Sequence, residues 1–225
     1  QRLVVIDAKD GAVRPLLSTS IRDMEPSPDG RWVAVLSEAE ATPLPGAERA
    51  VQSAILTRGR LALVEIATGR VVQLTAPLDV APHLLRWTSE ADRILIWTRR
   101  DGETWRDGAL AFIGLDGEIE RPPLHGLEPW EAGRTIDELR PVRAGLLRGR
   151  SAVHARRTGE SRFDWWILRD DAAVNATAKL AAPPARLAAV DGPRALLFAD
   201  GGAWRIDGDG GLAPLSEPGE DIAGG

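Results

Sequence analysis

A short pattern occurs twice near the start of the sequence, and this repeat limits the folds that the chain can adopt. The first copy runs from Arg2 to Leu16 and turns at Asp10-Gly11. The second runs from Arg60 to Leu74 and turns at Thr68-Gly69, and it aligns with the first without a gap, glycine on glycine. Strand, glycine turn and strand in this order predict a β-hairpin, and its recurrence predicts a repeat architecture.

A tight turn between two apolar runs follows the first hairpin. Ser27-Pro28-Asp29-Gly30 combines a proline that presets its own φ with residues that tolerate turn geometry, and the apolar run from Trp32 follows at once. The stretch from Leu84 to Trp97 has the same pattern after the second hairpin, and Ser89-Glu90-Ala91-Asp92 aligns there with the tetrapeptide. We therefore predict that this turn links the first and second strands of one repeat.

Three more hairpins follow at similar spacing. They turn at Asp116-Gly117, near Asp170-Asp171, and within Asp207 to Gly210. Units of about 40 to 60 residues with four short strands are typical of β-propeller blades. The sequence predicts an all-β fold, a β-propeller of four-stranded antiparallel blades, with about four and a half blades of a seven- or eight-bladed ring. Because an open ring has unpaired sheet edges, we expect residues 1–225 to be a partial propeller domain of a longer protein.

One connection is longer than a blade needs. Between the strands at Trp32–Leu36 and Leu61–Ile66, the segment Pro43-Leu44-Pro45-Gly46 is a helix-start signal, and the apolar residues after it recur at helical spacing. We predict a helical insertion near residues 38–58. Long insertions on repeat scaffolds are often functional loops, and a solvated elaboration fits the pattern as well. Two further irregular stretches run from Trp97 to Asp107 and from Gly126 to Arg140.

Charge and composition argue against several classes of partner. A net charge of -5 disfavours nucleic acid, because neutralising phosphates requires a surplus of Lys and Arg. No apolar run approaches the roughly 20 residues that span a bilayer, so we expect no membrane partner. The sequence has no cysteine, which excludes disulfides and thiolate chemistry and leaves both cytoplasm and periplasm open. Its strand-like start at Gln1-Arg2 reads as a cut within a longer protein.

The sequence offers no catalytic or metal-binding constellation. A G-x-S-x-G nucleophile motif is absent, and the three histidines, His83, His125 and His154, lie in separate blades without zinc-ligand spacing. We interpret them as structural or surface residues, and predict no catalytic residue, metal or cofactor. The run from Asp207 to Gly210 matches part of a dinucleotide or calcium pattern but lacks the helix and the remaining ligands, so a hairpin turn is the better interpretation.

Two other patterns have structural explanations. Asn175-Ala176-Thr177 matches a glycosylation site, but it falls where another blade has Leu74-Thr75, which favours a strand. A locally basic stretch fits solvated strand faces, with an anchor for a peptide carboxylate as the functional alternative. Its residues are Arg140, Arg143, Arg148, Arg150, Arg156, Arg157 and Arg162.

Ser27-Pro28-Asp29-Gly30-Arg31-Trp32-Val33-Ala34, followed by the hairpin from Leu61 to Leu74, resembles the propeller domain of prolyl-oligopeptidase-family serine peptidases. That family includes dipeptidyl and acylaminoacyl peptidases and the lasso-peptide isopeptidases, and the same motif also occurs in TolB-like propellers. The resemblance implies a propeller that sits over an α/β-hydrolase domain and limits which substrates reach its serine. Nothing in residues 1–225 matches the catalytic residues of such a domain.

We therefore expect a substrate-gating and docking propeller of a serine peptidase, with a peptide (or isopeptide) substrate and a hydrolase domain of the same protein as partners. Dipeptidyl peptidases hold the substrate amino terminus with a glutamate pair, and by that resemblance Glu38 and Glu40 are candidate substrate contacts. Arg49, in the predicted rim loop of residues 37 to 58, is the third candidate. The glutamates are not adjacent as in that family. The alternatives are a non-enzymatic TolB-like protein-binding scaffold and a secreted propeller with an unknown ligand.

Overall fold

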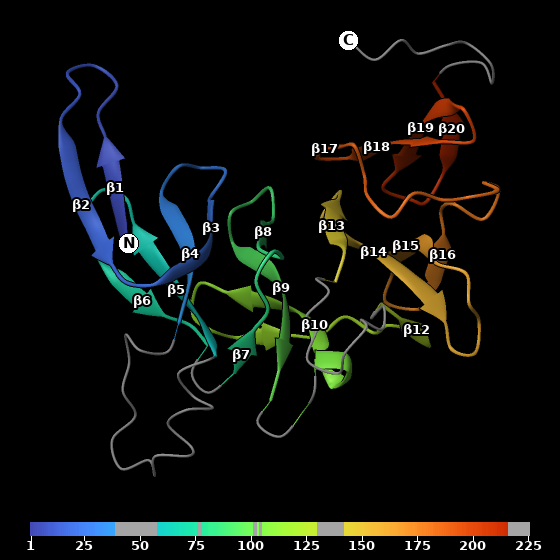
Figure 1. The fold of residues 1–225 in the computed structure, drawn as a ribbon, viewed down its shortest axis with the longest axis horizontal. Helices are drawn as coiled ribbons and strands as arrows, with labels where there is room; N and C mark the ends of the chain where they lie inside the picture. The colour runs from blue at the N-terminus through green and yellow to red at the C-terminus, as the bar shows by residue number, and fades with distance from the viewer. Residues whose placement is uncertain (39–57, 76–77, 101–102, 104, 130–141, 216–225) are drawn as a thin grey trace. The chain divides into compact units, whose positions relative to one another are not determined.

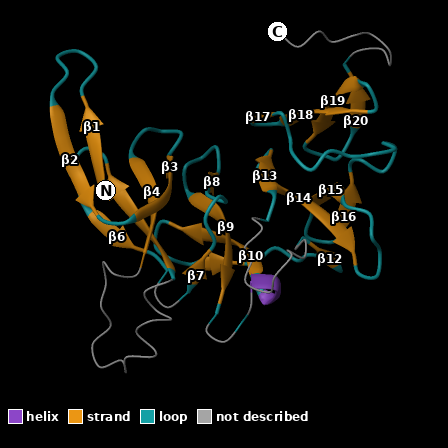
Figure 2. Ribbon diagram, in the orientation of Figure 1, coloured by secondary structure: helices purple, strands orange, loops and turns teal. Residues whose placement is uncertain are grey.

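The computed structural model describes residues 1–38, 58–75, 78–100, 103, 105–129 and 142–215. The chain divides into two compact units, Gln1–Arg121 and Pro122–Gly225. In the described parts of both, strands and loops account for the structure except for one turn of 3-10 helix at Trp105–Asp107 (Figure 2). The helical insertion predicted near residues 38–58 lies outside the described residues apart from its first and last positions.

Unit 1 begins with a hairpin and continues with two sheets (Figure 1). In the hairpin, β1 (Arg2–Ile6) pairs with β2 (Val13–Ser18). The next four strands form an antiparallel sheet in chain order: β3 (Ile21–Pro26), β4 (Trp32–Glu38), β5 (Gly59–Glu65) and β6 (Val71–Gln73). In the second sheet, β7 (Asp79–Val80) and β8 (Arg86–Trp87) both pair with β9 (Arg93–Arg99), so they form one interrupted first strand. β10 (Ala109–Gly114) and β11 (Ile119–Glu120) complete it.

Unit 2 contains two sheets of the same kind. In the first, β12 (Leu127–Glu128) and β13 (Ala144–Leu147) both pair with β14 (Arg150–Arg157), and β15 (Asp164–Leu168) and β16 (Ala173–Asn175) follow. The second sheet has the order β17 (Ala189–Asp191), β18 (Arg194–Ala199), β19 (Gly202–Asp207) and β20 (Leu212–Pro214). The described residues therefore form half a blade and four four-stranded blades, which confirms the predicted β-propeller architecture.

Backbone hydrogen bonds confirm the repeat of the first hairpin in the second. In the first hairpin, Asp7 donates to the carbonyl of Ala12 and accepts from Gly11; in the second, Glu65 donates to Arg70 and accepts from Gly69. Gly11 and Gly69 have φ values of 73° and 75°, a conformation that glycine adopts without strain. A turn one residue shorter closes the hairpin at Asp207 to Gly210, where Asp207 donates to Gly211 and accepts from Gly210, which confirms that interpretation.

The second copy of the Ser-Pro-Asp-Gly turn is shifted by one residue from the predicted alignment. Gly30 donates to the carbonyl of Ser27, and at the equivalent place Ala91 donates to the carbonyl of Thr88. Thr88 therefore corresponds to Ser27, and Ala91, with φ of 57°, takes the place of Gly30. The prediction that Ser89 starts the turn was wrong, because the threonine hydroxyl performs the same bonding as serine by accepting the amide of Arg93.

Apolar side chains pack between neighbouring sheets within each unit. In unit 1, Leu3 of the hairpin packs with Val33, Val35 and Val64 of the sheet β3–β6. The opposite face of that sheet supplies Leu61 and Leu63 to a larger cluster shared with the next sheet. In unit 2, a third cluster joins β14–β16 to β18–β20. Trp165 lies in this cluster, and Trp166, on the other face of β15, is buried as well.

Candidate functional site

Glu38, one of the three predicted substrate contacts, is the last residue of β4 and forms an ion pair. Its Oε1 lies 3.1 Å from Nη2 of Arg22 on β3. About a third of each side chain is exposed, so water screens this pair and its expected contribution to stability is below about 1 kcal/mol. Glu40 and Arg49 lie outside the described residues, so the grouping of the three stays a prediction.

The first strands of the two sheets of unit 1 lie against each other, and charged side chains gather on them. β3 contacts β8. Asp23 on β3 accepts the backbone amides of Met24 (2.9 Å) and of His83 (2.7 Å), the latter from the loop between β7 and β8. We call Asp23, Glu25, His83 and Arg86 the first-strand surface. Asp23 joins the two blades at this surface, and His83 is exposed on it, while Met24 is exposed on the opposite face of β3.

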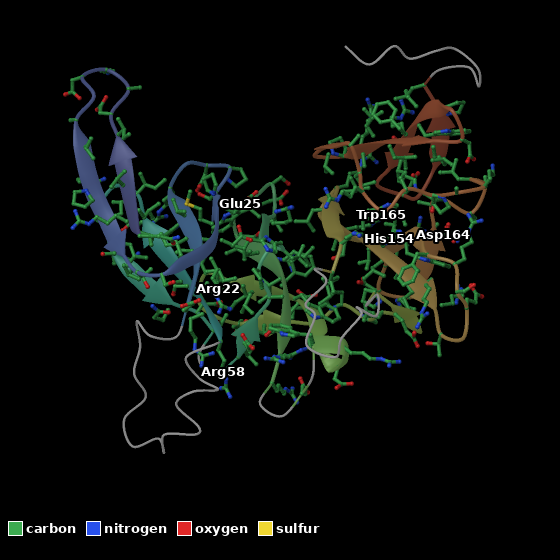
Figure 3. All side chains as sticks on the ribbon, viewed as in Figure 1. Arg22, Glu25, Arg58, His154, Asp164 and Trp165 are labelled. Atoms are coloured by element: carbon green, nitrogen blue, oxygen red, sulfur yellow. The ribbon has the colours of Figure 1, made fainter. Side chains whose placement is uncertain are left out.

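Glu25, labelled in Figure 3, is the carboxylate of the first-strand surface whose pKa is shifted. Partial burial raises the pKa of Glu25, the guanidinium of Arg86 opposes the rise from 3.9 Å away, and the negative charge of Asp23 adds to it. The carbonyl of Glu25 accepts the indole N–H of Trp87 at 2.9 Å, which fixes its backbone against β8. The first-strand surface therefore places a half-buried carboxyl group beside a guanidinium group, on two strands that a hydrogen bond holds together.

A second group of charges stands where β5 begins and β9 ends. Asp79 is buried, and its Oδ1 accepts the backbone amide of Gly59 at 2.7 Å. Its Oδ2 lies 2.9 Å from Nη2 of Arg99, and the Arg99 guanidinium stands 4.2 Å from the ring centroid of Trp105. A Cβ on Gly59 would lie 2.3 Å from the carbonyl oxygen of Val80, so only glycine fits this junction. Asp79 thus ties the two blades of unit 1 together.

Unit 2 has a comparable group at the end of β14. Glu128 on β12 pairs with Arg156 at 3.0 Å, and the Arg156 guanidinium lies 5.6 Å from the ring centroid of Phe163. Phe163 also stacks on His154, with ring centroids 5.3 Å apart. In each unit, then, an arginine near the end of a second strand sits between a carboxylate of the first strand and an aromatic ring of the following loop.

Asp164 in unit 2 is a buried carboxylate with several donors, close to His154 and Trp165 in Figure 3. It accepts from Nε of Arg162 (2.9 Å), Nδ2 of Asn175 (3.1 Å) and Oγ1 of Thr177 (2.8 Å). Burial raises the pKa of Asp164, but the hydrogen bonds from Arg162, Thr177 and Asn175 outweigh it and hold the pKa below its ordinary value. This network fixes β15 to β16 and has a structural role.

The predicted equivalence of Asn175-Ala176-Thr177 with the strand end at Leu74-Thr75 is confirmed. Ala176 donates to the carbonyl of Trp165 as Leu74 donates to that of Leu61. The hydroxyl of Thr177 accepts the amide of Trp165, and that of Thr75 accepts the amide of Leu61.

The three histidines have different local environments. His83 is exposed, with its φ of 72° in a loop of unit 1; in unit 2, His125 contacts the carbonyl of Arg169 through Nε2, and His154 is buried. Among the described residues no group of three or more His, Cys, Asp or Glu side chains could hold a metal. The described part also contains no helix long and apolar enough to cross a membrane.

The basic stretch of unit 2 is largely engaged within the unit. Arg156 and Arg162 form the ion pairs above, Arg150 donates to the carbonyl of Gly208, and Arg157 lies over the ring of Trp166. These contacts favour a structural role over a free carboxylate anchor. Sequence reasoning missed Asp79 and Arg99, since their contacts join residues far apart in the chain and no local pattern marks them.

No protein-family model matches the sequence, and no curated protein matches it. Solved structures do resemble the fold. Dipeptidyl peptidase 4 from Porphyromonas gingivalis has a TM-score of 0.58 and 10% identity over 96% of this chain and 36% of its own. Oligogalacturonate lyase from Vibrio parahaemolyticus has a TM-score of 0.57 and 12% identity over 95% of this chain and 59% of its own.

A puromycin-hydrolyzing peptidase from Mycobacterium tuberculosis has a TM-score of 0.56 and 16% identity over 96% of this chain and 32% of its own. At such identities the likeness establishes the fold. The chain spans about a third to three-fifths of the length of these three proteins. Two of them are peptidases and one is a lyase, so the fold accommodates more than one activity.

Proposed function

We propose that this chain is the propeller part of a serine peptidase of the prolyl-oligopeptidase family, and that it admits and orients peptide substrates. The chemistry would belong to an α/β-hydrolase domain outside residues 1–225. The proposal is supported by the Ser27-Pro28-Asp29-Gly30-Arg31-Trp32 motif and by the likeness to two peptidases. The assignment of peptide-bond hydrolysis therefore rests on this motif and on the two similar peptidases. Residues 1–225 would supply the scaffold.

The observation that carries a gating role is the first-strand surface of unit 1. Blades of a propeller surround a central channel, and the innermost strand of each blade lies nearest to it. β3 and β8 belong to the first strands of consecutive blades and contact each other, so we place them at this channel. Glu25 of β3 and Arg86 of β8 place one negative and one positive side chain there, 3.9 Å apart. A narrow peptide with charged ends would interact with both signs of charge there, while a folded protein would be excluded by size.

A first test is the sequence encoded beyond Gly225. A following domain with a G-x-S-x-G motif supports the proposal. A stop codon after the remaining blades, with no such domain, overturns it and leaves the alternative of a non-enzymatic TolB-like binding scaffold. Because a lyase also resembles this fold, the fold alone does not identify the longer protein as a peptidase.

The second test uses the longer protein and compares two substrates. Glu25→Gln should change kcat/KM for charged peptides by about fivefold or more, because it removes a partly desolvated charge from the path. Hydrolysis of a small neutral ester, which needs no steering, should stay within twofold. Glu118→Gln, an exposed glutamate of unit 1 beyond the first-strand surface, is the matched control. Equal effects on both substrates, or none, would contradict gating by this surface.

A further inference from the structure

The edge of β1 is paired on one side only within the described residues. β1 and β2 form a two-stranded sheet, whereas each of the four other sheets has a second strand beside its third. β1 reads Arg2-Leu3-Val4-Val5-Ile6, and its last four residues are all apolar. Natural proteins protect such an edge with charges, proline or another element, because an open apolar strand invites pairing. From Leu3 to Ile6 this edge carries none of those protections.

The internal repeat identifies what the edge is built for. β1 corresponds to β5, since Asp7 and Glu65 make the same turn bonds in the two copies of the repeat. The far edge of β5 carries β4 along its whole length, with pairs from Glu38↔Gly59 to Trp32↔Glu65. By this correspondence, β1 has the position of a third strand, and its open edge is where a second strand belongs.

The backbone groups on the edge point outward. Asp7 bonds across to Ala12, so the pair Ile6↔Val13 is of the non-hydrogen-bonded type, and the peptide groups of Ile6 and Val4 face away from β2. In β5 the groups at the corresponding positions, Val64 and Ala62, face β4. The main-chain donors and acceptors for another antiparallel strand are therefore already aligned.

The hairpin is also firmly seated, so its edge is presented in a fixed place. Leu3 packs on Val33, Val35 and Val64, and the Arg14 guanidinium donates to the carbonyl of Ile66. The opposite face remains open: Val4 and Ile6 are 38% and 62% exposed, while their counterparts Ala62 and Val64 are buried. Half of a blade is thus fixed in position with the other half absent from the described residues.

We propose that β1 binds the inner hairpin of a propeller blade, which is two antiparallel strands of which the second is apolar and runs antiparallel to β1. This hairpin would come from propeller polypeptide outside the described residues and would complete a four-stranded blade with β1 and β2. The inference rests on the repeat alone and does not depend on the proposed peptidase function.

A second copy of the chain fits this edge less well. In a two-fold β1–β1 pair, both hairpins would turn their Leu3 faces to the same side. The cluster at that face already includes β4 and Ile21 of β3, so the sheet β3–β6 extends beneath the vacant half. In such a pair, β3 and β4 of each copy would clash with the β1–β2 hairpin of the other copy. A separate two-stranded hairpin has no attached sheet, so it can pair with β1 without this clash.

The test adds a synthetic peptide with the sequence of residues 20–38, the inner hairpin of the first full blade, to the chain of residues 1–225. Hydrogen exchange should slow at least tenfold at the amides of Val4 and Ile6. Ile6→Pro removes one outward donor and should weaken peptide binding at least about fivefold, equivalent to one hydrogen bond of about 1 kcal/mol. Val13→Pro is the matched control: it is the cross-strand partner, equally exposed at 62%, and its amide faces the outer edge.

Retention of binding by Val13→Pro together with its loss in Ile6→Pro supports the proposal. Absence of protection at Val4 and Ile6 in the wild type overturns it, and this measurement needs no variant to fold. Equal binding by both proline variants also overturns it. Concentration-dependent protection of β1 without peptide would instead assign the edge to a second copy and would overturn the proposed occupant.

Discussion

Asp79 in unit 1 and Asp164 in unit 2 are both buried carboxylates beside an arginine, but Asp79 connects two blades and Asp164 connects parts of one blade. Asp79 holds the start of β5 through the amide of Gly59 and the end of β9 through Arg99, so it joins two blades. Asp164 takes its donors from Arg162, Asn175 and Thr177, all within a single blade. One carboxylate sets how neighbouring blades meet, and the other sets the geometry inside a blade.

The difference indicates where a propeller of this kind tolerates change. Apolar packing between sheets is non-directional, so it holds blades together without fixing their relative height. A buried carboxylate with two bonded partners in different blades adds that direction. Within a blade the ladder bonds already fix the geometry, so Asp164 adds stability to a structure that is otherwise specified. Substitution of Asp164 should therefore lower the stability of one blade, whereas substitution of Asp79 should loosen the junction between two blades.

The largest effect is expected for Asp164→Ala. The substitution leaves Nδ2 of Asn175 and the hydroxyl of Thr177 without their acceptor, and removes the partner of Arg162. Breaking a buried pair of this kind costs about 3 kcal/mol, reduced from larger values because Arg162 is partly exposed. Urea unfolding should show this loss, and hydrogen exchange should place it in unit 2. Asp171→Ala, an exposed residue of the β15–β16 turn, is the control. A loss below about 1 kcal/mol would show that the network is not cooperative.

Much of the fold follows from local sequence patterns. The hairpins at Gly11 and Gly69 were predictable because strand alternation and glycine turns are short-range signals, and both glycines have the positive φ that such turns need. The alignment of the second Ser-Pro-Asp-Gly turn was wrong by one residue. The residue types could not reveal the correct alignment, because threonine at position 88 takes the role of serine through its hydroxyl, and Ala91 adopts a positive φ although it is not glycine.

The candidate sites were less predictable. β7 and β12 have two residues each, too few to show any period, so the first strands that carry Asp79 and Glu128 left no pattern. The raised pKa of Glu25 depends on burial and on Arg86, which belongs to the next blade along the chain. Glu38 was selected by resemblance, and its pairing with Arg22 depends on the register of β3 against β4. Such contacts exist only in the folded chain.

A smaller effect is expected for Asp79→Ala, which tests the tie between blades. The free energy of unfolding should fall by about 2 kcal/mol, because the Gly59 amide loses its acceptor, while Arg99 keeps its stacking on Trp105. The specific readout is faster exchange at Gly59, with the ladder amides of β4 and β5 unchanged. Glu118→Ala, exposed in the same unit, is the control. Equal acceleration throughout β5 would mean that Asp79 stabilises the blade itself, which would remove the contrast with Asp164.

The smallest effect is the pH dependence that Asp164 contributes. Its folded pKa lies below the ordinary value of 3.8, so the carboxylate is favoured in the folded state. That stability is present above about pH 4 and is lost as the pH falls through the folded pKa, because the unfolded chain then binds the proton more readily. The difference in free energy of unfolding between wild type and Asp164→Asn should therefore narrow as the pH is lowered from 6 to 3. A difference that stays constant would show that the network depends on the shape of the side chain, and the charge of Asp164 would then have no part in holding the blade.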